Sequence, residues 1–219
     1  MAPKITLYYF DLKGLGEPIR LLMTYAGIEF TDYRFTDRND FMKMKENGEL
    51  PFGQVPMIKV EDGDGAPQFI SQSGAILRYL SRLAGLYPED LVQAAQVDMA
   101  LEQQADAFLG NLVLSYGPRF GFELEDDVAE KAKAMIDKEV LPRHLGNIEK
   151  LLAASPTGWL AGTEKPQACD FAWVGRLEGH MFNKLGFSER LAALTDFPKC
   201  RALIEKHNAL PSVVAYYAK

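Results

Sequence analysis

Three carboxylates at a regular spacing form the clearest pattern of chemically active side chains in this sequence. Asp98, Glu102 and Asp106 follow one another at intervals of four residues, which places them on one face of a predicted helix. Like charges at this spacing destabilise an isolated helix by about 0.2–0.5 kcal/mol. The ordinary explanation is a solvated helix face, and the alternative is that the stripe has a function.

Cysteine and histidine, the other side chains that commonly do chemistry, show no useful spacing. Cys169 and Cys200 lie far apart in predicted helices, so there is no CxxC pair, zinc-binding spacing or disulfide framework, and we expect packed thiols. His144, His180 and His207 lack the spacing of metal ligands, and we expect structural or solvated roles for them. We therefore predict no metal site.

A proline inside a strand-like run raises a different question. The stretch PFGQVPMIKV, residues 51–60, reads as a short β-strand that contains Pro56. Proline lacks the N–H donor of a sheet ladder and is confined to strand edges, first positions or bulges. Either this is an edge strand, or the chain needs a fixed kink where another backbone approaches.

The elements that position these residues follow from the hydrophobic pattern. ITLYYF is a continuous apolar run typical of a strand buried on both faces, and Pro18 suits the first turn of a helix that ends at Gly27. The opening strand-helix-strand unit should be parallel, and the loop EDGDGA should connect an antiparallel hairpin. We predict strands at 5–10, 29–35, 55–60 and 67–71, and helices at 18–27, around 41–45 and at 73–85.

Strand signals end near residue 91, and apolar residues then recur at spacings of three and four. We predict helices over 97–112, 127–154, 168–183, 198–207 and 211–218, with a kink at Pro142 in the second of them. Their predicted buried faces include Val97, Leu101, Ala105, Phe108 and Leu112, and then Val128, Ala132, Met135, Ile136, Val140, Leu145, Ile148 and Leu152. The sequence thus predicts an α/β domain at 1–84, a linker at 85–90 and an all-helical domain at 91–219.

Composition restricts the class of protein further. The 219 residues are 47% hydrophobic, which suits a globular protein with a sizeable core. A net charge of −6 argues against binding to nucleic acid or to an anionic membrane, since either needs a dense positive surface. We find no secretory leader and no run of roughly 20 apolar residues, so we expect a cytoplasmic protein.

Four segments carry, in this order, a resemblance to a known family: YFDLKGLGEPIR, PFGQVP, SQSGAILRYL and VDMALEQQADAF. The chain resembles a cytosolic glutathione S-transferase of the sigma type, the branch that includes the glutathione-dependent prostaglandin D synthases, and the resemblance runs nearly end to end. It implies a thioredoxin-like N-terminal domain, an all-α C-terminal domain, and transfer of the glutathione sulfur to apolar electrophiles in detoxification. It also implies a homodimer that uses glutathione as a co-substrate and needs no other cofactor.

The resemblance assigns roles to individual residues. Tyr9 is the expected catalytic tyrosine, whose hydroxyl donates a hydrogen bond to the glutathione sulfur, whereas Tyr8 should face the core because strand side chains alternate. Pro56 should follow a cis peptide bond, so that the backbone of Val55 pairs with the cysteinyl part of glutathione like an added strand. Asp106 should reach across a two-fold interface to the γ-glutamyl group in the neighbouring subunit.

Other residues are expected around the two substrates. Ser73 and Gln72 should bind the γ-glutamyl carboxylate at a helix N-terminus. Lys45, unless it is simply solvated, should pair with the glycine carboxylate, and Gln54 should bind the tripeptide backbone. Phe41, which stands where relatives commonly carry a tryptophan, is also expected at the glutathione site. The electrophile would be contacted by Phe10, Leu15, Met99 and Gln103.

Several positions depart from the family pattern. Leu15 replaces an arginine that several sigma-type relatives carry near the thiolate, and Ala105 replaces an aspartate that accompanies a cation in prostaglandin synthases. Gln167 is a poor helix cap, so the start of its helix should depend on Asp170. Phe52 is either a plug into the partner subunit or a locally packed residue.

Two other functions stay open. One is a glutathione-dependent isomerase of prostaglandin-type endoperoxides, which the departures at Leu15 and Phe41 disfavour. The other is a non-catalytic structural or ligand-binding relative, which the presence of Tyr9, Ser73 and Asp106 disfavours. A thioredoxin-like oxidoreductase would need cysteines in the N-terminal domain, and that domain has none.

Overall fold

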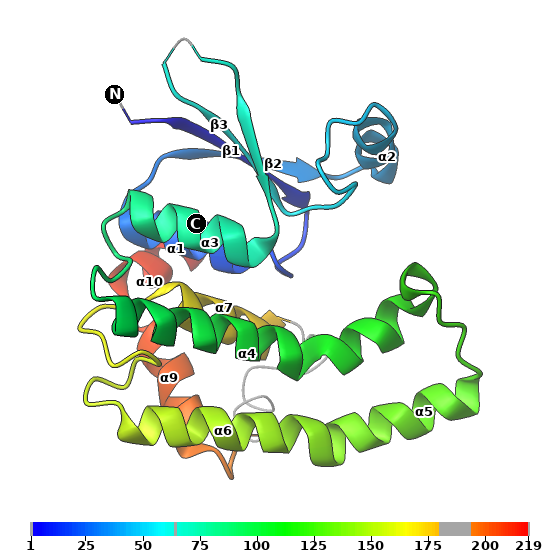
Figure 1. Cartoon of the computed structure of the whole chain (residues 1–219), viewed down its shortest axis with the longest axis vertical. Coiled ribbons are helices and arrows are strands. Elements are labelled where there is room, and N and C mark those ends of the chain that lie inside the picture. The colour runs from blue at the N-terminus through cyan, green and yellow to red at the C-terminus, as the bar shows by residue number, and fades with distance from the viewer. Residues whose placement is uncertain (1, 64, 180–193, 219) are drawn as a thin grey trace.

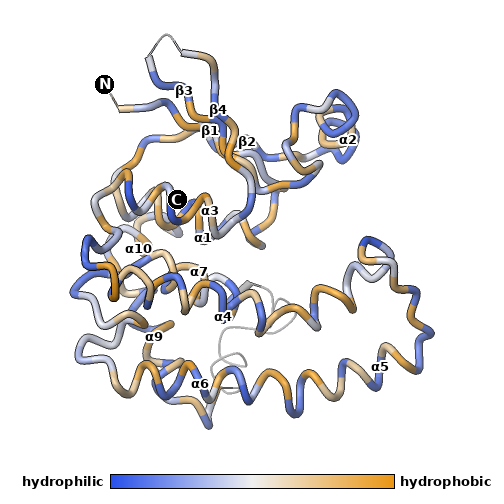
Figure 2. Tube along the Cα trace, in the orientation of Figure 1, coloured by the Kyte–Doolittle hydropathy of each residue, from blue (hydrophilic) through white to orange (hydrophobic). Residues whose placement is uncertain are grey.

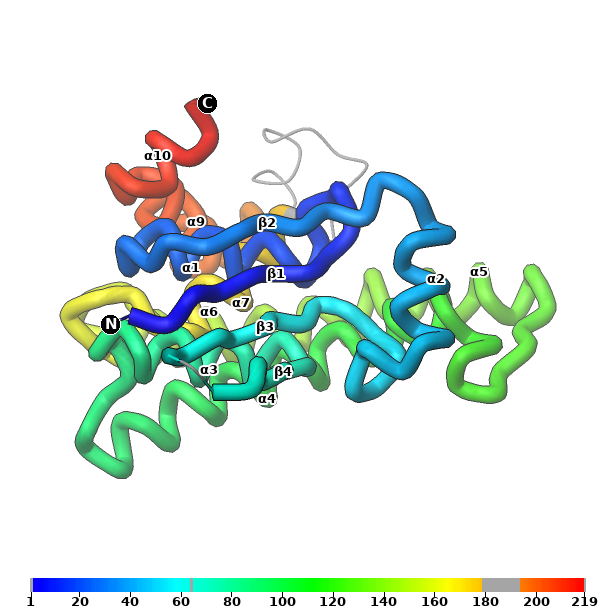
Figure 3. Tube along the Cα trace, turned by 90° about the horizontal axis from the view of Figure 1, so that it is seen from above, coloured from blue at the N-terminus to red at the C-terminus, as the bar shows by residue number. Residues whose placement is uncertain are grey.

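A four-stranded mixed sheet forms the N-terminal part of the structure, a computed structural model that describes residues 2–63, 65–179 and 194–218. The strands are β1 (Lys4–Phe10), β2 (Phe30–Phe35), β3 (Met57–Glu61) and β4 (Gln68–Ser71). Their order is β2-β1-β3-β4, with β1 parallel to β2 and β3 antiparallel to both β1 and β4 (Figure 3). The predicted parallel unit and the predicted hairpin are both confirmed.

Two helices cover one face of this sheet and separate it from the rest of the molecule (Figure 1). They are α1 (Glu17–Ala26) and α3 (Ser73–Leu83), while α2 (Arg38–Glu46) lies at the end of the sheet. Because β1 has a strand on each side and α1 against it, Ile5 and Leu7 are buried as predicted. α1 ends at Gly27 with φ 67°, a left-handed conformation that glycine adopts without steric cost.

The remainder of the described chain is helical. Its helices are α4 (Leu91–Tyr116), α5 (Asp126–Met135), α6 (Leu141–Ala154), α7 (Ala168–Gly179), α9 (Pro198–Asn208) and α10 (Pro211–Tyr217), with a short 3₁₀ helix at Gly117–Phe120. α7 packs against α1, α3 and α4 and so joins the two parts (Figure 1). On α7 the fully buried Trp173 donates its indole N–H to the carbonyl of Ala100 at 2.8 Å, which is the partner that a buried indole requires.

The predicted helices are present, but part of their predicted buried face is not buried. Ala105 is exposed, as are Val128 and Met135 at 45% and 53%. For Val128 and Met135 the reason is that α4 and α5 extend together beyond the other helices, so that no further layer of the described chain packs on them (Figures 1 and 2). The helix predicted over 168–183 is confirmed as far as Gly179, whereas its last four positions, including His180, lie outside the described residues.

The kink predicted at Pro142 takes the form of a π-helical turn. Residues Ile136–Val140 form this turn between α5 and α6, and the N–H of Leu141 donates to the carbonyl of Ile136, five residues earlier. A proline ring clashes with the carbonyl four residues before it in a regular helix. The wider π turn makes room at this point, so the helix continues without a break.

Asp170 fixes the start of α7. Its carboxylate is fully buried and accepts hydrogen bonds from the N–H groups of Leu160 at 2.8 Å and Gln167 at 2.7 Å. Burial raises the pKa of Asp170 to about 6, and the two hydrogen bonds oppose this shift only in part. The expectation that this helix start depends on Asp170 is therefore confirmed.

We expect Asp170→Asn to destabilise the protein by a pH-dependent amount. At pH 7 one of the two N–H groups loses its acceptor, which costs about 1–3 kcal/mol. Because the pKa of Asp170 is raised in the folded state, its protonation adds stability below about pH 4. That contribution disappears as the pH rises through about 6.

The difference in unfolding free energy between wild type and Asp170→Asn should therefore be larger at pH 4 than at pH 7. Between the two pH values this difference should change by at most about 3 kcal/mol, at 1.36 kcal/mol per pKa unit. Urea unfolding at the two pH values measures it, and other carboxyl groups cancel in the difference. A difference that grows with pH contradicts the prediction.

The cysteines and histidines take structural positions in the described chain. Cys169 and Cys200 are free and buried, as expected, and burial raises the pKa of each thiol. His207 is buried with its Nδ1 atom 3.0 Å from the side-chain oxygen of Asn208. Among the described residues, no helix has the length and apolar character needed to cross a membrane.

Candidate active site

Tyr9 lies near the end of β1, and the loop that follows holds its hydroxyl. The N–H of Leu15 donates to the Tyr9 hydroxyl oxygen at 3.0 Å, and the side chain is only 7% exposed. The loop approaches this closely because Gly14 and Gly16 have no side chains. A Cβ atom at Gly14 would lie 2.6 Å from the hydroxyl, and one at Gly16 would lie 2.5 Å from the ring. The segment GLGEP therefore fits against Tyr9.

The Tyr9 hydroxyl is a hydrogen-bond donor at neutral pH. Burial raises the pKa of Tyr9, while the N–H of Leu15 and the charge of Arg176 lower it by less. The phenol therefore keeps its proton. Since the Leu15 N–H occupies one lone pair of the oxygen, the O–H is left to donate to another group. A neutral phenol placed in this way can stabilise an anion that lies next to it.

A buried arginine fixes the same loop. Arg20 is fully buried and donates to Asp32 at 3.0 Å and to Glu17 at 3.2 Å. It also donates to the carbonyl oxygen of Leu12 at 3.0 Å, within the turn after β1. From α10, Tyr217 donates to Glu17 at 2.9 Å. This network ties the loop, α1, β2 and the last helix together.

A pocket of about 270 Å³ joins the loop after β1 to the start of α3 and one face of α4. Leu15, Gln72 and Ser73 are among its lining residues, so the structure brings together three predicted site residues. Ser73 is the first residue of α3, and no acidic residue stands in the first turn, which leaves the N–H groups of the helix start to an anion. Gln72 has φ 75°, and strained backbone of this kind clusters at ligand sites.

The loop before β3 gathers four more of the predicted residues. The peptide bond between Val55 and Pro56 is cis, as predicted, and the β3 ladder begins one residue after Pro56. Lys45 extends from α2 over this loop, with its Cε atom 3.3 Å from the position of a Cβ atom at Gly53. Gln54, which stands between Gly53 and Val55 in the sequence, is half buried. Lys45, Gln54, Val55 and Pro56 therefore share one region of the surface.

Phe10 and Phe41 pack in an aromatic cluster on the other face of β1. The ring centre of Phe41 lies 5.1 Å from that of Phe10 and 5.8 Å from that of Phe35. Tyr8 joins the same cluster, 5.1 Å from the ring of Tyr33, and is half buried rather than part of the core. The structure thus packs Phe41 against other rings, and its place at the glutathione site stays a prediction.

Met99 and Gln103 face α6, so we correct their assignment to the electrophile site. Met99 lines a separate pocket of about 310 Å³ together with Leu151 and Ala154 of α6. The side-chain nitrogen of Gln103 lies 2.7 Å from the Nδ1 atom of His144, which is also on α6. Neither residue lines the pocket that contains Leu15 and Ser73.

The acidic stripe on α4 divides into two parts. Arg78 of α3 pairs with Asp98 at 2.6 Å and with Glu102 at 2.5 Å. Asp106 is exposed, and within the described part of the chain it forms no ion pair. Two of the carboxylates therefore attach α4 to α3, so the stripe is not simply a solvated face. Asp106 is left to contact something else.

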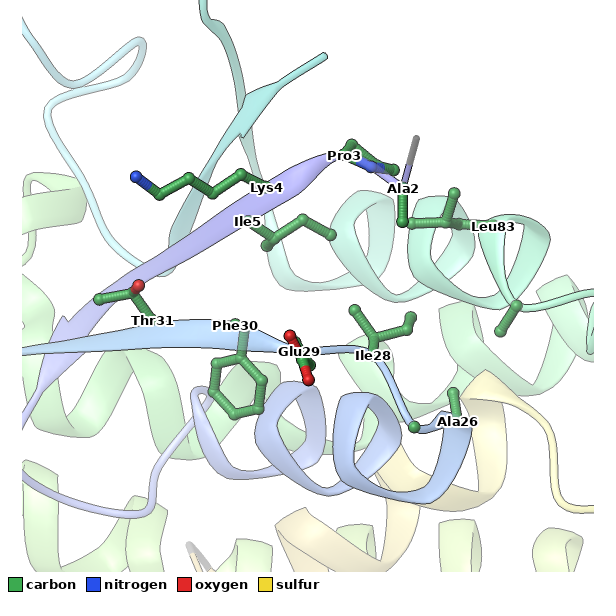
Figure 4. Close-up of a pocket in the computed structure, with 12 residues that line it drawn as sticks. Ala2, Pro3, Lys4, Ile5, Ala26, Ile28, Glu29, Phe30, Thr31 and Leu83 are labelled. Carbon is green, nitrogen blue, oxygen red and sulfur yellow. The ribbon is translucent and has the colours of Figure 1, made fainter. Parts of the chain in front are cut away.

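A larger pocket, of about 900 Å³, lies at the opposite end of β1 from Tyr9 (Figure 4). Its lining comes from the start of β1, the connection from α1 to β2, and the end of α3. Lys4 and Glu29 are its charged residues. None of the predicted site residues lines it. Within the described chain no three His, Cys, Asp or Glu side chains gather in a way that could hold a metal ion.

Sequence analysis missed three charged residues at this site. Glu17 and Arg20 stand three residues apart at the start of an otherwise apolar helix, and charges inside an apolar run were the available signal. Arg176 is a similar case on α7, where it is half buried with its Cζ atom 5.3 Å from the ring centre of Phe108. These charges belong to helices α1 and α7, whereas Tyr9 belongs to strand β1.

Comparison with protein families gives two matches that together span most of the chain. Residues 5–82 match the family model described as "Glutathione S-transferase, N-terminal domain", and residues 118–219 match "Glutathione S-transferase, C-terminal domain". Glutathione S-transferase alpha-3 of Rattus norvegicus is 31% identical over 97% of this chain and 88% of its own length. A glutathione S-transferase of Anopheles gambiae is 30% identical over 99% of this chain and 97% of its own.

Solved structures with the same arrangement cover both the sheet and the helices. Prostaglandin synthase D of Nilaparvata lugens has a TM-score of 0.81 and 25% identity, with 99% of this chain and 98% of that one covered. A nematode-specific glutathione S-transferase of C. elegans has a TM-score of 0.79 and 28% identity, with 99% and 97% covered.

Proposed function

Since the chain belongs to the glutathione S-transferase family, we propose that Tyr9 activates glutathione by donating a hydrogen bond to its thiolate. The enzyme is a glutathione transferase, which joins the sulfur of glutathione to hydrophobic electrophiles. Its fold is a thioredoxin-like domain followed by the helical C-terminal domain of the family.

The observation that carries the proposed mechanism is the Tyr9 hydroxyl, which Leu15 holds in place while its own proton stays free to donate. A thiol with an ordinary pKa of about 8.5 is mostly protonated at neutral pH, and only the thiolate is a good nucleophile. A hydrogen bond to a charged group contributes about 1.5–3 kcal/mol. At 1.36 kcal/mol per unit, this lowers the thiol pKa by about one to two units.

We propose that glutathione spans the loop before β3 and the start of α3. Ser73 and Gln72 would bind the γ-glutamyl carboxylate, helped by the unoccupied N–H groups of the helix start. The backbone of Val55, before the cis-proline, would pair with the cysteinyl unit. Lys45 and Gln54 would bind the glycine end. The support for these roles is the position of the five residues around two neighbouring loops.

An ultraviolet titration of enzyme-bound glutathione tests this function. We expect the bound thiol to titrate about one to two units below its ordinary pKa of about 8.5. If glutathione binds and its thiol pKa is unchanged, the chain uses the fold for binding or structure, and the proposed mechanism fails.

We also propose that the enzyme is a homodimer whose sites each include Asp106 of the partner subunit. The support is the exposed carboxylate of Asp106, which forms no ion pair within the described part of the chain. Phe52 is 62% exposed on its loop, which favours a plug into a partner over local packing. Exposed apolar residues of α4 and α5 that a second copy could cover are Leu91, Val92, Met99, Leu109, Val128 and Met135.

Mixed dimers test the role of Asp106 across the interface. A dimer of one Tyr9→Phe chain and one Asp106→Ala chain contains one site with both residues intact only if Asp106 acts on the neighbouring subunit. We expect this mixed dimer, isolated through two different affinity tags, to recover about half of the wild-type activity. If Asp106 acts within its own chain, the activity should equal the mean of the two homodimeric variants.

The homodimeric Asp106→Ala variant should raise the KM for glutathione about tenfold or more, as expected for the loss of a charge-assisted hydrogen bond. Asp98→Ala is the matched control, because Asp98 stands on the same helix but pairs with Arg78 of its own chain. Asp98→Ala should leave the KM for glutathione unchanged. Equal effects of the two substitutions argue for a general effect of charge on α4.

A second candidate activity is the isomerisation of a prostaglandin-type endoperoxide. The observation that favours it is the TM-score of 0.81 with prostaglandin synthase D of Nilaparvata lugens over nearly the whole chain. The absence of an arginine at Leu15 and of an aspartate at Ala105 argues against it. Direct assay of endoperoxide conversion with and without glutathione separates the two activities.

The finer classification is also our proposal. We place the chain in the sigma class, as a cytoplasmic detoxification enzyme that needs no cofactor beyond its co-substrate glutathione. We propose domains at 1–84 and 91–219 with a linker at 85–90, supported by the end of α3 at Leu83 and the start of α4 at Leu91.

A further inference from the structure

Arg176 is a cation for which the proposed mechanism has no use. It is half buried on α7, and its Nε atom is buried without a hydrogen-bond partner among the described residues. Within that part of the chain it forms no ion pair, and its nearest compensation is the ring of Phe108, 5.3 Å from its Cζ atom. A buried charge costs several kcal/mol unless it is paired, and a ring face returns only about 0.5–2 kcal/mol. Among the described residues the guanidinium thus lacks an anionic partner, and it suits an anion brought by a ligand.

The packing of α7 brings its backbone next to Arg176 close to the start of α1, which follows the loop that holds Tyr9. Gly175 approaches Pro18 so closely that a Cβ atom there would overlap the proline ring. Pro18 stands three residues after Leu15, which holds the Tyr9 hydroxyl. Without a side chain at Gly175, α7 comes close enough for the next residue, Arg176, to reach the surroundings of that hydroxyl.

The electrostatics agree with this placement. The charge of Arg176 lowers the pKa of Tyr9, and Tyr9 and Tyr116 are the titratable groups that act on Arg176 in return. Because burial raises the pKa of Tyr9, its phenol is neutral at pH 7 and does not compensate the guanidinium. Burial lowers the pKa of Arg176 to about 10, which still leaves it charged at neutral pH.

We propose that Arg176 binds a carboxylate of the electrophile, so that the enzyme prefers acceptors that join a negative charge to an aromatic or apolar body. A guanidinium presents its donors in a planar fork that matches the two oxygens of a carboxylate. The buried ring of Phe108 lies 5.3 Å from the Cζ atom of Arg176 and packs on one side of the guanidinium. The glutathione sulfur is a single atom to which Tyr9 already donates in the proposed mechanism. It therefore matches the two parallel donors of a guanidinium less well than a carboxylate does. This inference rests on the proposed function and deepens it.

A matched pair of acceptors tests the proposal: 4-chloro-3-nitrobenzoate and its methyl ester. In both, the thiolate sulfur bonds to the ring carbon that carries chlorine, and chloride leaves with the electron pair of the broken bond. The ester is intrinsically more reactive, so kcat/KM for each acceptor is divided by its uncatalysed rate with glutathione. We expect the wild-type enzyme to favour the acid over the ester by about tenfold or more on this scale, the size of one charge-assisted hydrogen bond.

Arg176→Met should lower the normalised kcat/KM for the acid by about 10- to 100-fold, and that for the ester by less than about threefold. Arg176→Lys keeps the charge without the fork and should recover part of the preference for the acid. Arg82→Met is the control, because Arg82 also stands over a ring, that of Tyr87, at 4.5 Å but lies at the far end of α3. It should leave the acid-to-ester ratio unchanged.

Three results would overturn the inference. The first is a wild-type enzyme that conjugates the ester but shows no preference for the acid, which leaves the proposed function intact. The second is an equal loss for acid and ester in Arg176→Met together with a raised pKa of the bound glutathione thiol, which would assign Arg176 to the thiolate. The third is an equal loss together with a lower unfolding temperature, which would make Arg176 structural. If neither acceptor is conjugated by the wild type, the proposed function itself fails.

Discussion

Tyr9→Phe should raise the pKa of the enzyme-bound glutathione thiol by about one to two units. It should also lower kcat/KM near pH 6.5 by about 10- to 100-fold. The substitution removes the hydroxyl that we propose as the donor to the sulfur, and Leu15 loses the acceptor for its N–H. At a pH above both thiol pKa values, variant and wild type should converge, because the sulfur is then ionised in either enzyme. The ultraviolet absorbance of the thiolate, followed against pH, gives both thiol pKa values directly.

Tyr8→Phe is the matched control for this prediction. Its ring packs on that of Tyr33 at 5.1 Å on the other face of β1, so its hydroxyl is remote from the sulfur. We expect Tyr8→Phe to bind glutathione with the wild-type thiol pKa. The mechanism fails if Tyr9→Phe also keeps that pKa while remaining folded.

Arg20→Met should destabilise the protein by about 3–5 kcal/mol, the usual cost of breaking a buried ion pair from one side. Arg20 is fully buried, and methionine of similar length removes its hydrogen bonds to Asp32, Glu17 and the Leu12 carbonyl together. Glu17 would keep Tyr217 as a donor but lose its counter-charge. Urea unfolding at pH 7, monitored by tryptophan fluorescence at one fixed protein concentration, measures the loss.

Arg34→Met provides the comparison, because Arg34 pairs with the same Asp32 at 2.7 Å and with Asp11 at 2.9 Å but is largely solvated. An exposed pair contributes about 0–1 kcal/mol. We expect Arg34→Met to cost no more than that. Similar losses for the two arginines would mean that burial of Arg20 does not set the strength of the network.

The parts of the fold that depend on local signals were predictable from the sequence. The apolar run at Ile5–Phe10, the proline near the start of α1 and the glycine at its end each identify one element through its own residues. The turn-rich loop after β3 identified the hairpin in the same way. The role of Asp170 was predictable for the same reason, since its carboxylate accepts from the N–H of Gln167, only three residues earlier.

What could not be predicted depends on residues far apart in the sequence. Glu17 looks like a surface charge in the sequence, but it is buried and accepts a hydrogen bond from Tyr217, 200 residues away. Met99 and Gln103 were placed near Tyr9 because the sequence fixes which residues share a helix face but not which neighbour that face meets. Val128 and Met135 follow a correct helical period, yet among the described residues nothing buries that face.

The cis bond before Pro56 and the position of Ser73 are intermediate cases. Neither follows from the residues alone, because a proline in a strand and a serine at a helix start each have an ordinary local explanation. The order and spacing of four motifs made them predictable. No sequence motif pointed to Arg176 as a site residue, because its position depends on how closely α7 packs on Pro18.

The depth at which the two cysteines lie has a consequence for an enzyme of this kind. An enzyme whose acceptors are electrophiles exposes itself to alkylation by its own substrates, and protein thiolates are the first targets of such reagents. Cys169 and Cys200 are the only cysteines in the chain, and both are buried with their pKa values raised, so they stay protonated and out of reach. The sole reactive sulfur in the complex is then the one that glutathione brings, and each turnover carries it away.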